Sequence, residues 1–181
     1  SCGAQGTVAV TSNGGTSWQR VQAAGENAYL NNIEIAGPSA SYCVGEEGLI
    51  IKSVNGGNNW TALSSGVLSG LYSSFFFDEN TGWICGDSGK LILTTNGGNT
   101  FNNIDSKSNR YISDIYFINP NTGWYASGEK KVYKTTNGGN DWFTPDSTVF
   151  SGGVGAVQFV NTNTGIAFTF DNKILLTSNG G

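Results

Sequence analysis

The stretch TTNGGNDW at residues 135–142 decides the fold, because close copies of it recur at a fixed interval along the chain. The copies are TSNGGTSW at residues 11–18, SVNGGNNW at 53–60, TTNGGNTF at 94–101 and a shortened TSNGG at 177–181. Their asparagines are Asn13, Asn55, Asn96, Asn137 and Asn179, so the spacings are 42, 41, 41 and 42 residues. A constant interval of this length indicates a repeat architecture in which each repeat is one structural unit.

Further motifs keep the same interval around this Asn-Gly-Gly box. An aromatic residue follows five positions after the Asn of each complete box: Trp18, Trp60, Phe101 and Trp142. Asn-Thr-Gly precedes the later boxes, at residues 80–82, 121–123 and 163–165. Between the motifs, apolar residues alternate with polar ones, as in Ile112, Ile115 and Phe117, and this pattern predicts strands.

A repeat of about 41 residues accommodates four short strands, which is one blade of a β-propeller. In the fourth copy we predict an inner strand at residues 112–118, followed by strands at 123–127, at 132–136 and from Trp142 onward. The Asn-Gly-Gly box then forms the hairpin turn between the third and fourth strands, where its glycines supply positive φ. The aromatic residue after the box is expected to pack between neighbouring blades.

The sequence therefore predicts an all-β chain, a β-propeller with four-stranded antiparallel blades and about four blades present. Residues 1–181 form one domain, divided into repeats at 1–21 (partial), 22–63, 64–104, 105–145 and 146–181 (partial). A closed ring of four blades would not need an overlapping box at both ends. We therefore expect a segment of a larger ring.

The composition excludes several classes of function. The chain has no histidine, so a Ser-His-Asp triad and a His-ligated metal are excluded within it. Nine basic residues and a net charge of -4 argue against a nucleic-acid partner. No apolar run approaches the roughly 18 residues of a membrane span. The three cysteines show no metal-ligand spacing, and we expect buried free thiols, no metal and no cofactor.

The box, together with the Asn-Thr-Gly motif before it, resembles the BNR or Asp-box repeat, and looks most like the propeller family of the photosystem II stability and assembly factor. The resemblance covers essentially the whole chain. In this chain Asn replaces the acid of the box in all five copies, which keeps the turn but removes the charge. The resemblance is specific for fold and weak for function, because Asp-box propellers include sialidases, glycosidases, sorting receptors and assembly factors.

The boxes and their aromatics are interpreted as structural, since a neutral Asn between glycines offers too few oxygens for Ca²⁺. Glycosidase chemistry needs two carboxylates flanking a bond. Asp114 is the best candidate for a special acid, because the resemblance places its strand near the central channel. The favoured reading is nevertheless a solvated position on the other face of that strand. The resemblance also implies three arginines for a sialidase, or an arginine-rich patch for the assembly factor. With only Arg20 and Arg110, at positions that are not equivalent, neither site is expected.

The leading hypothesis is a non-catalytic protein-binding or assembly scaffold, exported from a bacterial cell into a multiprotein or cell-surface complex. The chain is expected to be secreted, extracellular or at the cell surface, with the periplasm as an alternative. The rival hypotheses are a glycan-binding module and an Asp-box glycoside hydrolase whose catalytic residues lie partly outside this segment.

The predicted binding surface lies on the face opposite the boxes, where the connections between blades vary in length and composition. Acidic turns would give this face a negative potential that attracts a basic partner. Solvated turn acids without a binding role are the alternative reading. The candidate binding residues are Glu46, Glu47, Asp87, Glu129, Asp171, Asp114 and Arg110.

Overall fold

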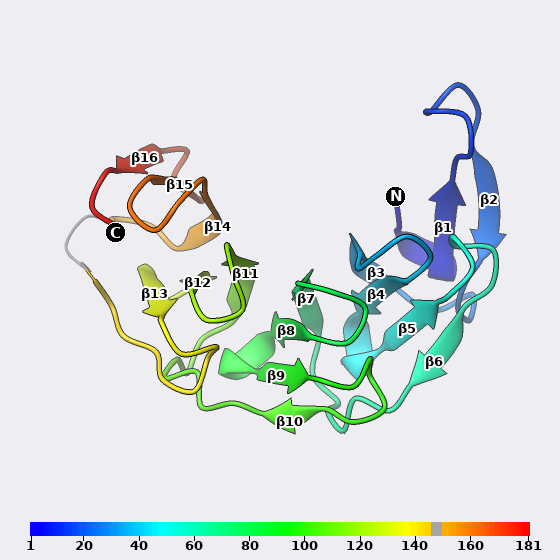
Figure 1. Cartoon of the computed structure of the whole chain (residues 1–181), viewed down its shortest axis with the longest axis horizontal. Coiled ribbons are helices and arrows are strands. Elements are labelled where there is room, and N and C mark those ends of the chain that lie inside the picture. Colours follow the sequence, from blue (N-terminus) through cyan, green and yellow to red (C-terminus); the bar gives the residue numbers. More distant parts are fainter. Residues whose placement is uncertain (146–149) are drawn as a thin grey trace.

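The structure is a computed structural model that describes residues 1–145 and 150–181. It is all-β apart from three single-turn 3₁₀ helices, η1 (Ala4–Gly6), η2 (Glu46–Gly48) and η3 (Asp87–Gly89). Figure 1 shows five sheets side by side in an open arc, with the first and last sheets well separated. The strand β1 pairs only with β2 within the described sheets, so the arc is not closed by pairing its two ends.

Each sheet contributes its strands in chain order from the inside of the arc outward. The first sheet is β1 (Thr7–Val10) and β2 (Gln19–Gln22). The second is β3 (Leu30–Ile35), β4 (Ser41–Gly45), β5 (Ile50–Ser53) and β6 (Thr61–Leu63). The third is β7 (Leu71–Phe76), β8 (Gly82–Gly86), β9 (Leu91–Thr94) and β10 (Asn102–Asn103). The fourth is β11 (Ile112–Phe117), β12 (Gly123–Ser127) and β13 (Lys131–Thr135), and the fifth is β14 (Val154–Phe159), β15 (Gly165–Thr169) and β16 (Ile174–Thr177).

All strand pairs are antiparallel, and the propeller fold with four-stranded blades is confirmed. The fourth strand of the third complete blade is reduced to one bridge between Lys134 and Phe143. Pro145 follows two residues later and has no N–H to donate to a ladder, which explains why this strand stops there. The predicted repeat boundary at residue 146 lies outside the described residues.

Adjacent sheets pack against each other along the arc, and in the described residues stacked aromatic pairs join them at every such interface except that between the first and second sheets. The second strand of one blade supplies Trp83, whose ring stacks 3.8 Å from that of Phe117 on the inner strand of the following blade. Tyr42 stacks in the same way on Phe76 at 3.8 Å, and Trp124 on Phe159 at 3.7 Å. We call these interfaces the seams.

The Asn-Thr-Gly motif is explained by the same seams. A Cβ added to Gly123 would lie 2.5 Å from the ring of Phe117, and Gly82 and Gly165 are crowded by the equivalent phenylalanines. The glycine therefore leaves room for the phenylalanine of its own blade, and the tryptophan after Gly82 and Gly123 reaches the following blade.

The box forms a compact turn between the third and fourth strands. In the third copy, the amide of Gly98 donates to the hydroxyl of Thr94 at 2.8 Å, and the amide of Thr100 donates to the side-chain oxygen of Asn96 at 3.0 Å. Gly97 and Gly98 both have positive φ. These bonds explain the recurrent Thr or Ser two residues before the Asn.

The aromatic residues after the box pack against the preceding blade. Trp142 is buried, and Trp60 and Phe101 are partly buried in seam clusters. The prediction of a core position is wrong for Trp18, whose side chain is 57% exposed. Its sheet is the first of the arc, so no preceding sheet of this chain covers it.

Candidate functional site

A groove runs along the concave side of the arc, where the inner strands β3, β7, β11 and β14 lie next to one another (Figure 1). It encloses a cavity of about 410 Å³. We call it the inner groove and define it by its polar and aromatic lining residues: Asn32, Glu34, Ser73, Phe75, Asp114, Tyr116 and Gln158. Apolar residues such as Val157 and Phe168 complete the lining, and no lysine or arginine lines the cavity within the described part of the chain.

The blades differ in the groove at positions where the fold makes them equivalent. Each inner strand has a register shift after its first residue, and the residue that follows the shift is Asn32, Ser73, Asp114 or Ala156. Two positions further along, the residue is Glu34, Phe75, Tyr116 or Gln158. No residue type recurs at either position, so the lining is not required by the repeat.

Asp114, which the sequence singled out, lies in the groove and bridges three blades. One carboxylate oxygen accepts a hydrogen bond from the hydroxyl of Ser73 at 3.0 Å, and the other accepts from the amide of Val157 at 2.9 Å. Burial raises the pKa of this carboxyl, while the two hydrogen bonds act in the opposite direction. Asp114 therefore holds neighbouring inner strands together.

Glu34 is the second carboxyl of the groove. Burial raises its pKa to about 7, and the charge of Asp114 adds to the rise. The described residues provide no cation beside it, so Glu34 is held between its protonated and charged forms near neutral pH. A cationic group entering the groove would stabilise the charged form.

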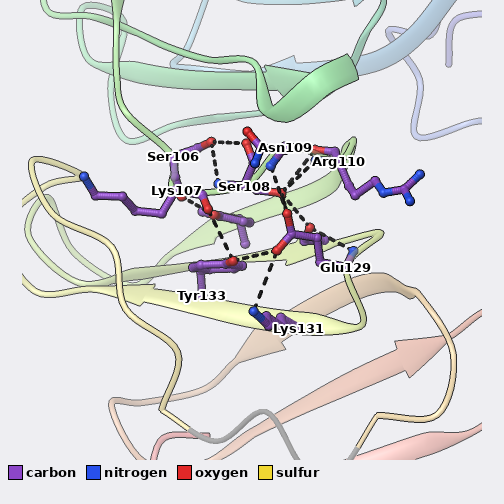
Figure 2. Close-up of polar contacts among 10 residues, drawn as sticks. Ser106, Lys107, Ser108, Asn109, Arg110, Glu129, Lys131 and Tyr133 are labelled. Atoms are coloured by element: carbon purple, nitrogen blue, oxygen red, sulfur yellow. Dashed lines mark hydrogen bonds and ion pairs between the residues drawn. The ribbon is translucent and has the colours of Figure 1, made fainter.

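The other predicted binding acids lie elsewhere, in the turns between second and third strands, and most of them bind groups of the protein. Glu129 accepts hydrogen bonds from the amide of Asn109 at 2.9 Å and the hydroxyl of Tyr133 at 2.9 Å, and pairs with Lys131 at 3.8 Å. Figure 2 shows these bonds converging on the carboxylate, with the Arg110 side chain pointing away from it. Although burial opposes the change, these hydrogen bonds lower the pKa of Glu129, which anchors the connection before β11.

Three other turn acids are anchored in similar ways. Glu46 accepts from the side chain of Asn31 at 2.9 Å, Asp87 accepts from the hydroxyl of Tyr72 at 2.6 Å, and Asp171 pairs with Lys173 at 3.0 Å. Glu47 is exposed. These contacts favour the alternative reading of solvated, structural turn acids.

Arg20 and Arg110 do not form a patch. Arg20 lies in the outer strand of the first sheet, whereas Arg110 lies just before the inner strand β11. Within residues 1–145 and 150–181, no three His, Cys, Asp or Glu side chains are grouped so as to hold a metal ion. None of the helices described there has the length and apolar character needed to cross a membrane.

Sequence reasoning missed two features. Glu34 was not singled out, although it lies two positions after the residue equivalent to Asp114, and this spacing alone could have placed it on the same side of the inner strands. The three cysteines were expected to be buried thiols, yet Cys2 is partly exposed and packs in one cluster with Cys43.

Comparisons with known proteins agree on the fold. A family model described as Photosynthesis system II assembly factor YCF48 matches residues 17–110, which is more than half of the 181 residues. No curated protein matches the chain. A solved structure of YCF48 from Cyanidioschyzon merolae superposes with a TM-score of 0.74 at 19% identity, over 97% of this chain and 64% of that one.

Two further structures show the range of functions built on this fold. YCF48 bound to D1 peptide matches with a TM-score of 0.66 at 18% identity, over 79% of this chain and 47% of that one. An ancestral GH74 enzyme matches with a TM-score of 0.67 at 21% identity, over 84% of this chain and 23% of that one. The chain thus spans about half of one YCF48 chain and just under two thirds of the other. Its family is assigned from the family model, because that model matches more than half of the chain. The chain belongs to the photosystem II assembly factor YCF48 family of β-propellers with BNR-type repeats.

Proposed function

We propose that this chain is part of a non-catalytic scaffold that binds an extended segment of a partner protein in the inner groove. The observation that carries the proposal is the divergence of equivalent positions in the groove, set against the recurrence of the same residue types in the seams. Recognition resides in the parts of a repeat protein that the repeat does not fix. An exported multiprotein or cell-surface complex remains our proposed setting.

The groove favours a partner segment that is apolar with a basic residue. Phe75, Tyr116 and Phe168 offer apolar surface, while Glu34 and Asp114 are the charged groups of the lining. A lysine or arginine beside Glu34 would pair with a carboxylate that has no cation of its own. The family assignment supports a protein partner, because a YCF48 structure contains a bound D1 peptide.

One observation favours a second candidate, a glycoside hydrolase. Glu34 and Asp114 line the same cavity, and an acid with a pKa of about 7 beside a second carboxyl is the arrangement that such an enzyme needs. Against it, both oxygens of Asp114 already accept hydrogen bonds from neighbouring blades. We therefore assign Asp114 a structural role, which is to hold neighbouring blades together.

Selection of peptides from a random phage-displayed library tests the scaffold proposal. The selected peptides are expected to contain Lys or Arg next to apolar residues, and a synthetic peptide is then titrated by fluorescence anisotropy. Glu34→Gln should weaken its affinity about tenfold, the effect of losing one charge-assisted contact. Affinity should rise between pH 6 and pH 8, since Glu34 becomes charged in that range.

Glu47→Gln is the matched control, because Glu47 is an exposed acid on the predicted loop face. A loss of affinity in Glu47→Gln with none in Glu34→Gln would move the binding surface to that face. Release of reducing sugar from β-glucans tests the rival. Hydrolysis that disappears in Glu34→Gln would establish the enzyme instead of the scaffold.

A further inference from the structure

Two cysteines meet across the first seam of the arc. Cys2 bridges to Val8 in the first sheet, and Cys43 lies in β4 of the second sheet. Both belong to one apolar cluster with Val8 and Ile51. Cys43 is fully buried, whereas Cys2 is partly exposed and its thiol donates to the carbonyl of Leu30 at 3.8 Å.

The same pair of positions belongs to one core cluster at every later seam. The equivalents of Cys2 and Cys43 share one core cluster each time: Val44 with Ile84, Cys85 with Tyr125, and Ala126 with Ala167. Cys2 and Cys43 do not hold the same repeat position, because Cys43 lies one residue further from the box of its blade than Cys2 does. Their side chains therefore project from opposite faces of the second strand. Adjacent blades pack with one face of the first blade against the opposite face of the next.

The third cysteine, Cys85, has no such partner. Cys85 occupies the position of Cys2 in its own blade, and residues in equivalent positions of different blades lie apart. Its neighbour across the seam is Tyr125, so Cys85 has no thiol opposite it. Only the first seam brings two sulfur atoms to the shared position within the described chain.

We propose that Cys2 and Cys43 are a modification site, at which exchange with a small-molecule or protein disulfide forms a disulfide bond between the first and second sheets. The inference is independent of the proposed binding function. Cys2 and Cys43 share one cluster, and the equivalent positions share one cluster at each later seam.

The pKa values of the two thiols are shifted in opposite directions, so Cys2 reacts before Cys43. The Cys43 side chain lowers the pKa of Cys2 to about 7, while the same contact and burial raise the pKa of Cys43. The thiolate of Cys2 attacks one sulfur of the oxidant, forms a mixed disulfide and releases one thiol. Cys43 then gives up its proton and attacks the sulfur of Cys2, which releases the second thiol. Two cysteine thiols are oxidised, and one disulfide is reduced to two thiols.

The bond would link the first sheet covalently to the second. The first sheet has two strands, whereas the second has four. A link between residues 2 and 43 closes a loop of roughly 40 residues, and a loop of this length restricts the unfolded chain substantially. We expect oxidation to raise the unfolding midpoint by about 5 °C and dithiothreitol to reverse the rise.

Peptide mapping under non-reducing conditions tests the proposal. The full chain is incubated with oxidised glutathione, its remaining thiols are blocked with N-ethylmaleimide, and the peptides are identified by mass spectrometry. We expect two of the three thiols to disappear, a peptide pair joined through Cys2 and Cys43, and a blocked thiol at Cys85. Cys85→Ser should leave the link intact, and Cys43→Ser should stop at a glutathione adduct on Cys2. A wild-type protein that accumulates this adduct, or that forms the link only between two chains, would overturn the proposal.

A second pair of cysteines tests the seam geometry away from the first residues of the chain. Val44→Cys and Ile84→Cys are introduced together into a chain in which Cys2, Cys43 and Cys85 are serine. Oxidation should join residues 44 and 84 within one chain. A folded variant that remains fully reduced under the same conditions would contradict the shared contact.

Discussion

The seams and the inner groove are built from the same four inner strands, yet they follow opposite rules. At the seams, Phe76, Phe117 and Phe159 occupy one repeat position, and each is covered by an aromatic ring of the preceding blade. In the groove, the neighbouring position carries Glu34, Phe75, Tyr116 or Gln158. Adjacent residues of one strand therefore serve two purposes, because successive side chains point to opposite sides.

The difference shows that the sequence repeat describes the seams of this molecule but not its groove. Residues that recur are those needed to pack one blade on the next, and their replacement should cost stability. Residues that diverge are not fixed by the repeat. Where they make no bond to a neighbouring blade, unlike Asp114, their replacement should alter binding or pH dependence with little loss of stability. Variants of the seams should therefore lose more stability than variants of the groove.

The largest effect is expected for Phe117→Ala in the seam. The ring of Phe117 is buried and stacks on Trp83, and its loss leaves a cavity, so the free energy of unfolding should fall by about 3–5 kcal/mol in urea denaturation. Ile35→Ala is the matched control, since Ile35 holds the equivalent position but is 75% exposed. Its free energy of unfolding should change by less than about 0.5 kcal/mol. Equal losses in the two variants would break the seam account.

A smaller loss is expected for Gly123→Ala, which adds a methyl group to the same seam. The new Cβ would lie 2.5 Å from the ring of Phe117, and displacing that ring should cost about 1–3 kcal/mol in the same denaturation experiment. Gly25→Ala provides the comparison, because a Cβ there meets no atom within 4 Å and the backbone lies outside the positive-φ region. If Gly123→Ala were as stable as Gly25→Ala, Phe117 would not require the glycine.

In the groove, Glu34→Gln should change the pH dependence of stability. The pKa of Glu34 rises from 4.5 to about 7 on folding, so the folded state binds more protons between these values and wild-type stability falls as pH rises through them. The variant avoids this loss. It should match the wild type below pH 4.5 and exceed it by about 1 kcal/mol above pH 7, after allowance for partial exposure. Glu47→Gln should show no such gain, and a gain of equal size there would contradict the assignment to burial in the groove.

The sequence predicted most of the residues that build the seams, but only one of the two acids of the groove. The Asn-Gly-Gly spacing predicted the blades and their strands, because turns and core residues recur with the unit they build. Asp114 was placed correctly on an inner strand, whereas Glu34 was missed because nothing recurs at its position. Contacts between blades, such as that of Cys2 with Cys43, depend on how adjacent sheets pack, and a one-residue displacement in sequence does not reveal them without the structure.

Hydroxyl-radical footprinting of the protein with and without its selected peptide shows whether the peptide binds in the inner groove. Tyr116 lies in the inner groove, and Tyr111, which is 36% exposed, lies beside the turn at Gly128 on the predicted loop face. The two tyrosines therefore report on the two surfaces within one experiment. The account predicts that the bound peptide protects Tyr116 from oxidation and leaves Tyr111 unchanged. Protection of Tyr111 alone, or of neither tyrosine at saturating peptide, would contradict it.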